Sequence, residues 1–247
     1  ALREAPDDVL NLINMTSVDD VNALYGNEEV RRRERVDARF INIAMKATCL
    51  GAVTSDALED GRVVSGVGGQ YNFVAQAHEL EGARSIILLK AVRESKGKVE
   101  SNIVWNYGHV TVPRHLRDII ITEYGVADLR GQPDEECVKR MLAITDSRFQ
   151  DELVREAIAA KKLAADFKLP EAWKKNTPDA IDAALRPHLG YLPTYPFGTE
   201  MDEVEQDLAL ALEHLQDHTA SFWQQAGYVA AAVASGPDAE PWRPHLQ

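Results

Sequence analysis

The sequence predicts an α/β fold with an open, mostly parallel sheet and a helical C-terminal extension. Short apolar, β-branched runs alternate with turn residues between positions 39 and 122, which is typical of strands. Near-continuous apolar runs such as Ser85–Leu89 indicate strands that are buried on both faces. After Gly131 the apolar residues recur at helical spacing, so helices are expected to dominate the rest of the chain.

The predicted elements divide the chain into an α/β domain over residues 1–168 and a helical extension with a tail over 169–247. Strands are predicted at 40–45, 51–54, 62–64, 85–89, 103–105, 110–112 and 118–121, with one helix at 73–80. Further helices are predicted at 133–144, 149–163, 203–215 and 222–234. A flexible tail is expected from Pro237 onward.

The composition restricts the partners and the compartment. The 247 residues carry a formal net charge of -12, which argues against nucleic acid or an anionic membrane as the main partner. A local basic pocket for a polyanionic ligand remains compatible with that charge. The two cysteines, Cys49 and Cys137, are expected to be buried hydrophobic residues in a reducing, cytoplasmic protein. We find no leader-like start, no membrane-spanning run and no metal-ligand spacing, so no metal site is predicted.

The most informative segment for function is the glycine-rich run Ser65–Phe73, SGVGGQYNF. It follows a predicted strand and precedes a predicted helix. Glycines at such a junction allow a tight turn and let backbone N–H groups approach a ligand. The beginning of a helix adds unpaired donors and a partial positive charge. The loop could therefore hold a phosphate, a carboxylate or a developing oxyanion, and a purely structural turn is the alternative.

Neither of the common nucleotide-binding motifs fits this loop. With glycines at 66 and 68, the dinucleotide fingerprint requires a third at 71, where Tyr71 stands. No Walker-type lysine follows the loop either.

An ordered series of motifs resembles the acetyl-CoA hydrolase/transferase family. The glycine loop is followed by Thr111–Arg114 (TVPR) and by Thr122–Gly131 (TEYGVADLRG), and Ser17–Asn22 (SVDDVN) precedes it. The resemblance covers about residues 10 to 165. It implies an open α/β sheet of the CoA-transferase kind, which is NagB/RpiA-like, and acyl-CoA and a small carboxylate as substrates.

The resemblance also implies roles for individual residues. The Gly69 N–H would stabilise the oxyanion, and Asn22 would help to bind the same oxygen, so these two are the predicted catalytic residues. Gly66, Gly68, Gln70 and Arg114 are the predicted contacts to coenzyme A. Asn22 as a turn residue and Arg114 as half of a structural ion pair are the alternatives.

In this family a glutamate attacks the thioester and forms a glutamyl-CoA intermediate. That glutamate lies several dozen residues before the segment that Ser17–Asn22 resembles, so we expect it outside this chain. Glu123 is the only tempting substitute, and a structural role suits it better. We therefore expect a missing N-terminal half as a partner, a chain that is inactive alone, and a homodimer.

Three further alternatives stay open at this point. The chain could be a non-catalytic module that binds CoA or a carboxylate. It could instead be an α/β enzyme that uses the glycine loop for a sugar phosphate. The basic run Arg31–Arg35 could be a solvated surface or a clamp for CoA phosphates.

Overall fold

A computed structural model describes residues 5–95, 97–196, 198–219, 226–228 and 230. The chain divides into two compact units, one up to Arg186 and one from Pro187. The predicted domain boundary at residue 168 falls inside the first unit, because that unit also contains helix α7, Pro178–Leu185.

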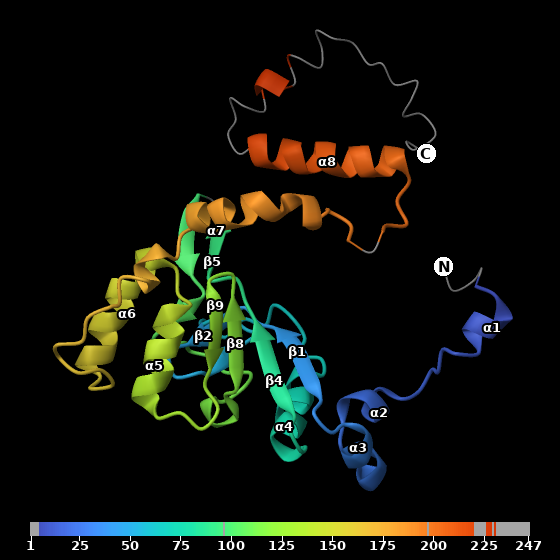
Figure 1. Ribbon diagram of the computed structural model, residues 1–247, viewed down its shortest axis with the longest axis horizontal. Coiled ribbons are helices and arrows are strands. Elements are labelled where there is room, and N and C mark those ends of the chain that lie inside the picture. The colour runs from blue at the N-terminus through green and yellow to red at the C-terminus, as the bar shows by residue number, and fades with distance from the viewer. Residues whose placement is uncertain (1–4, 96, 197, 220–225, 229, 231–247) are drawn as a thin grey trace. The chain divides into compact units, whose positions relative to one another are not determined.

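The centre of the first unit is a four-stranded sheet with the strand order β1-β4-β8-β9 (Figure 1). The strands are β1 (Arg39–Ile43), β4 (Arg84–Leu88), β8 (Ile119–Thr122) and β9 (Gly125–Asp128). The first three run parallel, and β9 returns antiparallel to β8. Isoleucine-rich segments such as Ile119–Ile121 form these strands because β-branched side chains pack well on a pleated surface. The predicted open, mostly parallel sheet is confirmed.

Smaller strands complete the α/β unit. A three-stranded sheet has the order β3-β2-β7, with β2 at Lys46–Thr48, β3 at Val53–Thr54 and β7 at Ile103–Val104. A hairpin is formed by β5 (Val92–Ser95) and β6 (Lys98–Ser101).

Helices cover one face of the four-stranded sheet. Helix α4 (Gln70–Glu79) lies against β1 and β4, where the Phe73 ring stacks on Phe40 at 5.5 Å between centroids. Helix α5 (Asp134–Ala143) packs on β9 through buried side chains such as Met141, and α6 (Ser147–Ala159) packs on α5. The main core lies on this face and includes both cysteines, as predicted.

The remaining helices are short or peripheral. They are α1 (Asp7–Leu10), α2 (Val18–Asn22), α3 (Glu28–Glu34) and, in the second unit, α8 (Glu203–His218). Helix α8 begins with a capping box between Asp202 and Glu205, which accounts for its sharp start. No helix among the described residues is long and apolar enough to cross a membrane.

Several sequence-based predictions of elements are wrong in detail. The predicted strands at 62–64 and 110–112 are only isolated bridges, in which Val63 pairs with Ala57 and Val112 pairs with Val53 of β3. The β5–β6 hairpin, β9 and α7 were not predicted. Of the helix predicted at 222–234, residues 226–228 and 230 are helical, and the rest lies outside the described residues.

Candidate active site around the glycine loop

The glycine loop, residues 65–69, connects an anchored segment to the first turn of α4. The Asp56 carbonyl oxygen accepts hydrogen bonds from Val64 N (2.8 Å) and Ser65 N (3.1 Å), which fixes the start of the loop. The Asp56 side chain is itself nearly buried and accepts hydrogen bonds from Thr111 Oγ1 and from His109 Nε2 (3.0 Å). The hydrogen bond from Thr111 is the main reason why the pKa of Asp56 lies below its usual value.

Gly68 and Gly69 are glycines for different physical reasons. Gly68 has φ +58°, in the left-handed region where a side chain is strained. Gly69 has an ordinary φ of −87°, but a Cβ built there would lie 2.5 Å from Asn22 Nδ2. Gly66 has no atom within 4 Å of such a Cβ. The structure thus brings Asn22 and Gly69, the two residues predicted as catalytic, into direct contact.

Both residues keep free hydrogen-bonding groups. Neither the Gly69 N–H nor the Asn22 carboxamide makes a hydrogen bond to any other described residue. Two donors therefore remain available side by side at the beginning of α4, where the helix also contributes partial positive charge.

The position of Asn22 is fixed by the residues around it. Gln76 Nε2 on α4 donates a hydrogen bond to the Asn22 carbonyl oxygen at 2.9 Å, and Arg35 donates to Gln76 Oε1 at 2.7 Å. Arg31 donates to the carbonyl oxygens of Ala23 (3.1 Å) and Tyr25. The basic run predicted as either a solvated surface or a phosphate clamp thus uses two of its arginines to position Asn22.

Gln70 ties the loop to the end of strand β1. It is buried, and its Nε2 donates a hydrogen bond to the Ile43 carbonyl oxygen at 3.2 Å. Its Oε1 is buried without a hydrogen-bond partner in the described part of the chain. Because the side chain is buried and bound to the end of β1, Gln70 is placed to hold the adjacent loop against the sheet.

A pocket of about 330 Å³ opens beside Ile43, at the carboxyl end of the parallel strands. Its lining includes the apolar residues Met45, Leu58 and Val92 together with the cations Lys46, Lys90 and Arg93. Ligands of open α/β sheets bind at this edge. This rule could have identified Lys46 from the sequence, because Lys46 follows soon after the first predicted strand.

Two polar groups in this pocket are notable. Lys46 Nζ donates to the Ser101 carbonyl oxygen at 2.8 Å and lies 5.8 Å from the centroid of the Tyr107 ring. Burial lowers the pKa of Lys46 below its usual range. Asn102 is also buried, and its Oδ1 has no hydrogen-bond partner among the described residues.

Glu123 links two strands at the same edge of the sheet. Its Oε2 accepts a hydrogen bond from Ala91 N at 2.8 Å, which joins the ends of β8 and β4. The cysteine thiols are unsuited to nucleophilic chemistry, because burial raises the pKa of Cys49 to about 12 and also raises that of Cys137. The described residues contain no cluster of three or more side chains that could hold a metal ion.

Arg114 lies away from the glycine loop. It begins a short 3-10 helix, in which the Leu116 carbonyl oxygen contacts His78 Nε2 at 2.9 Å. His78 lies near the end of α4, whereas Gly69 lies directly before its first residue. A helix of this length spans about 15 Å. The Arg114 guanidinium is exposed and lies 3.3 Å from a carboxylate oxygen of Asp134. Its predicted contact to coenzyme A stays a prediction.

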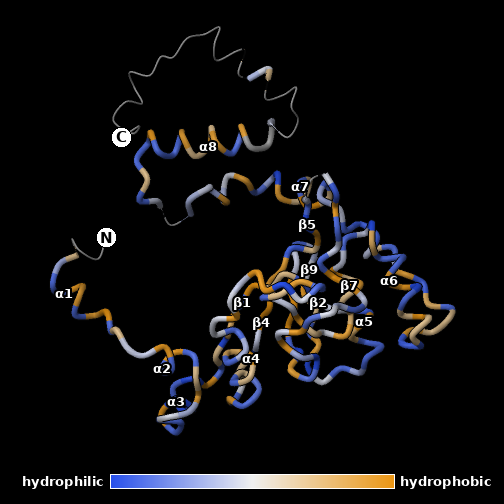
Figure 2. The backbone as a smooth tube through the Cα atoms, turned by 180° about the vertical axis from the view of Figure 1, so that it is seen from behind, coloured by the Kyte–Doolittle hydropathy of each residue, from blue (hydrophilic) through white to orange (hydrophobic). Residues whose placement is uncertain are grey.

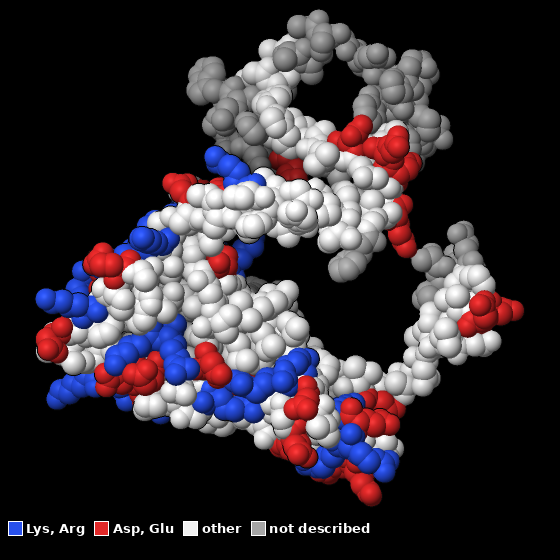
Figure 3. Space-filling view, in the orientation of Figure 1, with Lys and Arg blue, Asp and Glu red and all other residues white. Residues whose placement is uncertain are grey.

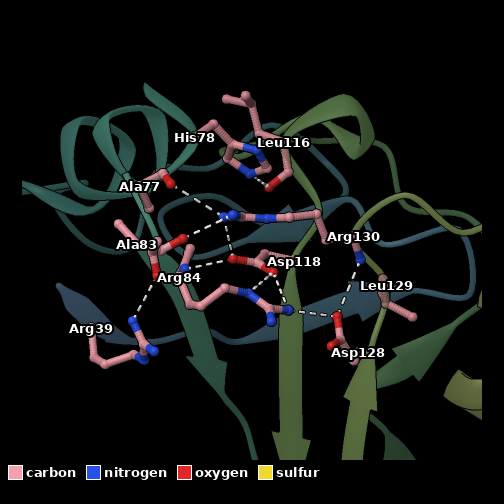
Figure 4. A network of polar contacts seen from close by, with 12 residues as sticks. Arg39, Ala77, His78, Ala83, Arg84, Leu116, Asp118, Asp128, Leu129 and Arg130 are labelled. Atoms are coloured by element: carbon pink, nitrogen blue, oxygen red, sulfur yellow. Dashed lines mark hydrogen bonds and ion pairs between the residues drawn. The ribbon is translucent and has the colours of Figure 1, made fainter. Parts of the chain in front are cut away.

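The opposite edge of the sheet holds a network of arginines and aspartates (Figure 4). The Asp118 carboxylate is almost fully buried and accepts hydrogen bonds from Arg84 (2.8 Å), Arg130 (2.6 Å) and Ser85 N (2.7 Å). Arg84 also pairs with Asp128 at 2.6 Å. Arg130 donates to the carbonyl oxygens of Ala77, near the end of α4, and of Ala83, which precedes β4. These groups mainly bind each other.

Comparison with characterised proteins identifies the family. The "Probable butyrate:acetyl-CoA coenzyme A-transferase" of Syntrophomonas wolfei is 36% identical over 120 residues, which is 47% of this chain and 27% of the relative. The 4-hydroxybutyrate coenzyme A transferase of Clostridium kluyveri is 30% identical over 118 residues, again 47% and 27%. The chain spans between 27% and 31% of the length of the curated relatives that it matches.

Among solved structures, RipA from Yersinia pestis is similar, with 32% sequence identity over 52% of this chain and 29% of that one, at a TM-score of 0.47. The profile of the acetyl-CoA hydrolase/transferase C-terminal domain matches residues 5–157, which is more than half of the chain and contains the glycine loop. The chain therefore belongs to the acetyl-CoA hydrolase/transferase C-terminal domain family.

Proposed function

We propose that this chain is part of an acyl-CoA:carboxylate CoA-transferase or acyl-CoA hydrolase, in which it supplies the oxyanion-stabilising groups. The observation that carries the proposal is the contact between Asn22 and Gly69, which leaves two free donors side by side. Such preplaced donors stabilise a developing negative charge without reorganisation.

In the proposed reaction a glutamate carboxylate, which we place outside these 247 residues, attacks the thioester carbonyl carbon. The carbonyl oxygen becomes an oxyanion that the Gly69 N–H and the Asn22 amide hold. Collapse expels the CoA thiolate and leaves an acyl-glutamyl anhydride. The thiolate then attacks the glutamyl carbonyl, releasing the first carboxylate and forming glutamyl-CoA. A second carboxylate resolves glutamyl-CoA by the reverse steps, or water hydrolyses it.

The remaining residues of the site support this chemistry. Gly68 provides the turn and Gly66 leaves open space next to the donors. Gln70 fastens the loop to β1. The pocket beside Ile43 combines an apolar lining with Lys46, Lys90 and Arg93, which suits an acyl-CoA or a small carboxylate.

The test is the exchange of labelled acetate into acetyl-CoA. It compares the 247-residue chain with the same chain joined to the part of the Syntrophomonas relative that precedes the matched region. We expect exchange only in the joined protein. Exchange by the chain alone would place the nucleophile inside it, with Glu123 as the first residue to replace. A folded joined protein that binds CoA without exchange would favour a non-catalytic binding module.

A further inference from the structure

One face of the four-stranded sheet is apolar and is left exposed by the described residues of the first unit. The strand register arranges its side chains in two rows that cross the sheet. The rows are Ile41–Ile86–Ile119 and Ile43–Leu88–Ile121–Val126. Ile41, Ile43 and Val126 are 60%, 76% and 63% exposed, and the other four are partly exposed. These seven residues are called the open face below.

The two faces of the same sheet differ in what covers them. The side chains between the rows, such as Ile87 and Ile120, point to the other face and are buried under α4 and α5. Sheets that are mainly parallel are normally covered on both faces. A contiguous apolar surface of this kind marks an interaction site. Figure 2 shows the hydrophobic character of β1 and β4, which supply four of the seven side chains.

Charged residues border the open face at both ends of the strands. At the carboxyl end the exposed residues Lys90 and Glu123 continue the alternation of Leu88 and Ile121. Arg39 and Arg84 follow the same alternation as Ile41 and Ile86, and they lie at the amino end of the strands. In Figure 3 Lys and Arg side chains are interspersed with Asp and Glu along the lower part of this unit, and a white surface lies above them. A partner would thus meet an apolar centre with charged groups of both signs around it.

We propose that the open face docks amphipathic helices of a further polypeptide segment, the counterpart of the part that precedes the matched region in the relatives. This proposal rests on the proposed function, which requires such a segment for its glutamate. The chain spans 27% to 31% of the relatives' length, and the matching family is that of a C-terminal domain, so the relatives have ample polypeptide for this role.

The geometry favours helices as the covering layer. Helices α4 and α5 already cover the opposite face, and a helix with one apolar stripe is the usual complement of a sheet face. The second row begins at Ile43, whose carbonyl oxygen is bound by Gln70, directly after the glycine loop. A segment docked there would lie next to the proposed oxyanion site.

The test measures binding without turnover. The preceding part of the Syntrophomonas relative is purified separately and titrated into the 247-residue chain by calorimetry. We expect Ile43→Lys and Ile41→Lys to weaken binding at least tenfold, because each would bury an unpaired charge. Val36→Lys is the matched control, since Val36 is 47% exposed and lies outside the sheet, and it should change the affinity less than twofold. Circular dichroism confirms that each variant is folded.

Three outcomes would overturn the proposal. They are equal affinities for all variants, no binding by the wild-type chain, and a wild-type dimer that Ile43→Lys dissociates, which would make a second copy the occupant. A complex that forms as expected but shows no acetate exchange would contradict the proposed function and leave the docking surface intact. Conversely, full exchange and unchanged stability of the joined protein carrying Ile43→Lys would contradict the docking surface alone.

Discussion

The two edges of the four-stranded sheet differ in how many of their polar groups are paired. At the amino edge Asp118, Arg84 and Arg130 bind one another and nearby backbone groups, and the Asp118 carboxylate is only 1% exposed. At the carboxyl edge the Gly69 N–H, the Asn22 amide and Asn102 Oδ1 have no partners among the described residues.

This difference separates groups that stabilise the fold from groups that are free to bind a ligand. Buried polar groups in native proteins are almost always paired, so the buried, unpaired Asn102 Oδ1 calls for an explanation, whereas Asn22 and Gly69 are partly exposed and accessible to a ligand. The contrast also shows that charge alone is a poor guide. The arginines at the amino edge mostly bind aspartates and backbone groups, with the buried Arg130 Nε as an exception, whereas the proposed site uses an amide and a glycine.

The largest effect on stability is expected at Asp118. Asp118→Ala should lower the free energy of unfolding by about 3–5 kcal/mol, because Arg84, Arg130 and the Ser85 N–H lose a buried partner. Urea denaturation of the 247-residue chain measures this loss. Asp128→Ala is the control, since Asp128 is half exposed, and it should cost less than about 1 kcal/mol. Similar losses for both would show that the network is not the source of stability.

The contact between Asn22 and Gly69 should be visible as a steric coupling. Gly69→Ala is expected to cost about 1–3 kcal/mol, because the new Cβ overlaps Asn22. In the Asn22→Ala background the same change should cost less than about 0.5 kcal/mol, since the overlap is gone. Gly66→Ala, where no atom lies near the added Cβ, should be nearly neutral. Additive costs of the two substitutions would mean that the residues do not touch.

The paired edge should also respond to acid. The Asp134 carboxylate has a lowered pKa, chiefly because Lys162 donates a hydrogen bond to it at 2.7 Å. A carboxyl whose folded pKa is depressed contributes stability above its unfolded pKa, and this is lost as the pH falls through the folded value. In the Asp134→Asn variant the free energy of unfolding should therefore fall less steeply with decreasing pH below about pH 4 than in the wild type. Melting curves recorded over a series of pH values measure this. The same dependence of the melting temperature on pH below about pH 4 in the variant and the wild type would contradict the prediction.

The smallest effect is expected at Arg114. Because its ion pair with Asp134 is exposed, Arg114→Ala should cost less than about 1 kcal/mol. If Arg114 is only half of this exposed ion pair, the affinity of the variant for CoA should stay within twofold of the wild type. A loss of CoA affinity beyond fivefold in calorimetry would instead show the phosphate contact that the motif implies.

The sequence patterns were enough to predict the parallel sheet and the four longest described helices, α4, α5, α6 and α8. The β5–β6 hairpin and β9 were missed because their residues, such as Lys98, Glu100 and Gly125, are poor strand formers that pair only in tertiary context. The contact between Asn22 and Gly69 was implied only by resemblance, since no local pattern predicts which distant side chain closes on a loop.

The pairing of the charged groups could not be predicted either. Arg31 and Arg35 look like surface charges in the sequence, yet they hold the segment that carries Asn22. The pocket beside Ile43 was also missed, because Lys46, Lys90 and Asn102 come from three separate segments that only the sheet brings together.

The most direct measurement of the central claim is the exchange rate of Asn22→Ala in the chain joined to the preceding part of the Syntrophomonas relative. Removing one oxyanion donor should lower kcat by about 10²–10³ and leave KM nearly unchanged. Asn22→Asp, which keeps the shape and removes the N–H donor, should be equally impaired. A kcat within threefold of the wild type for both variants would contradict the assignment of Asn22 and Gly69 as the oxyanion site.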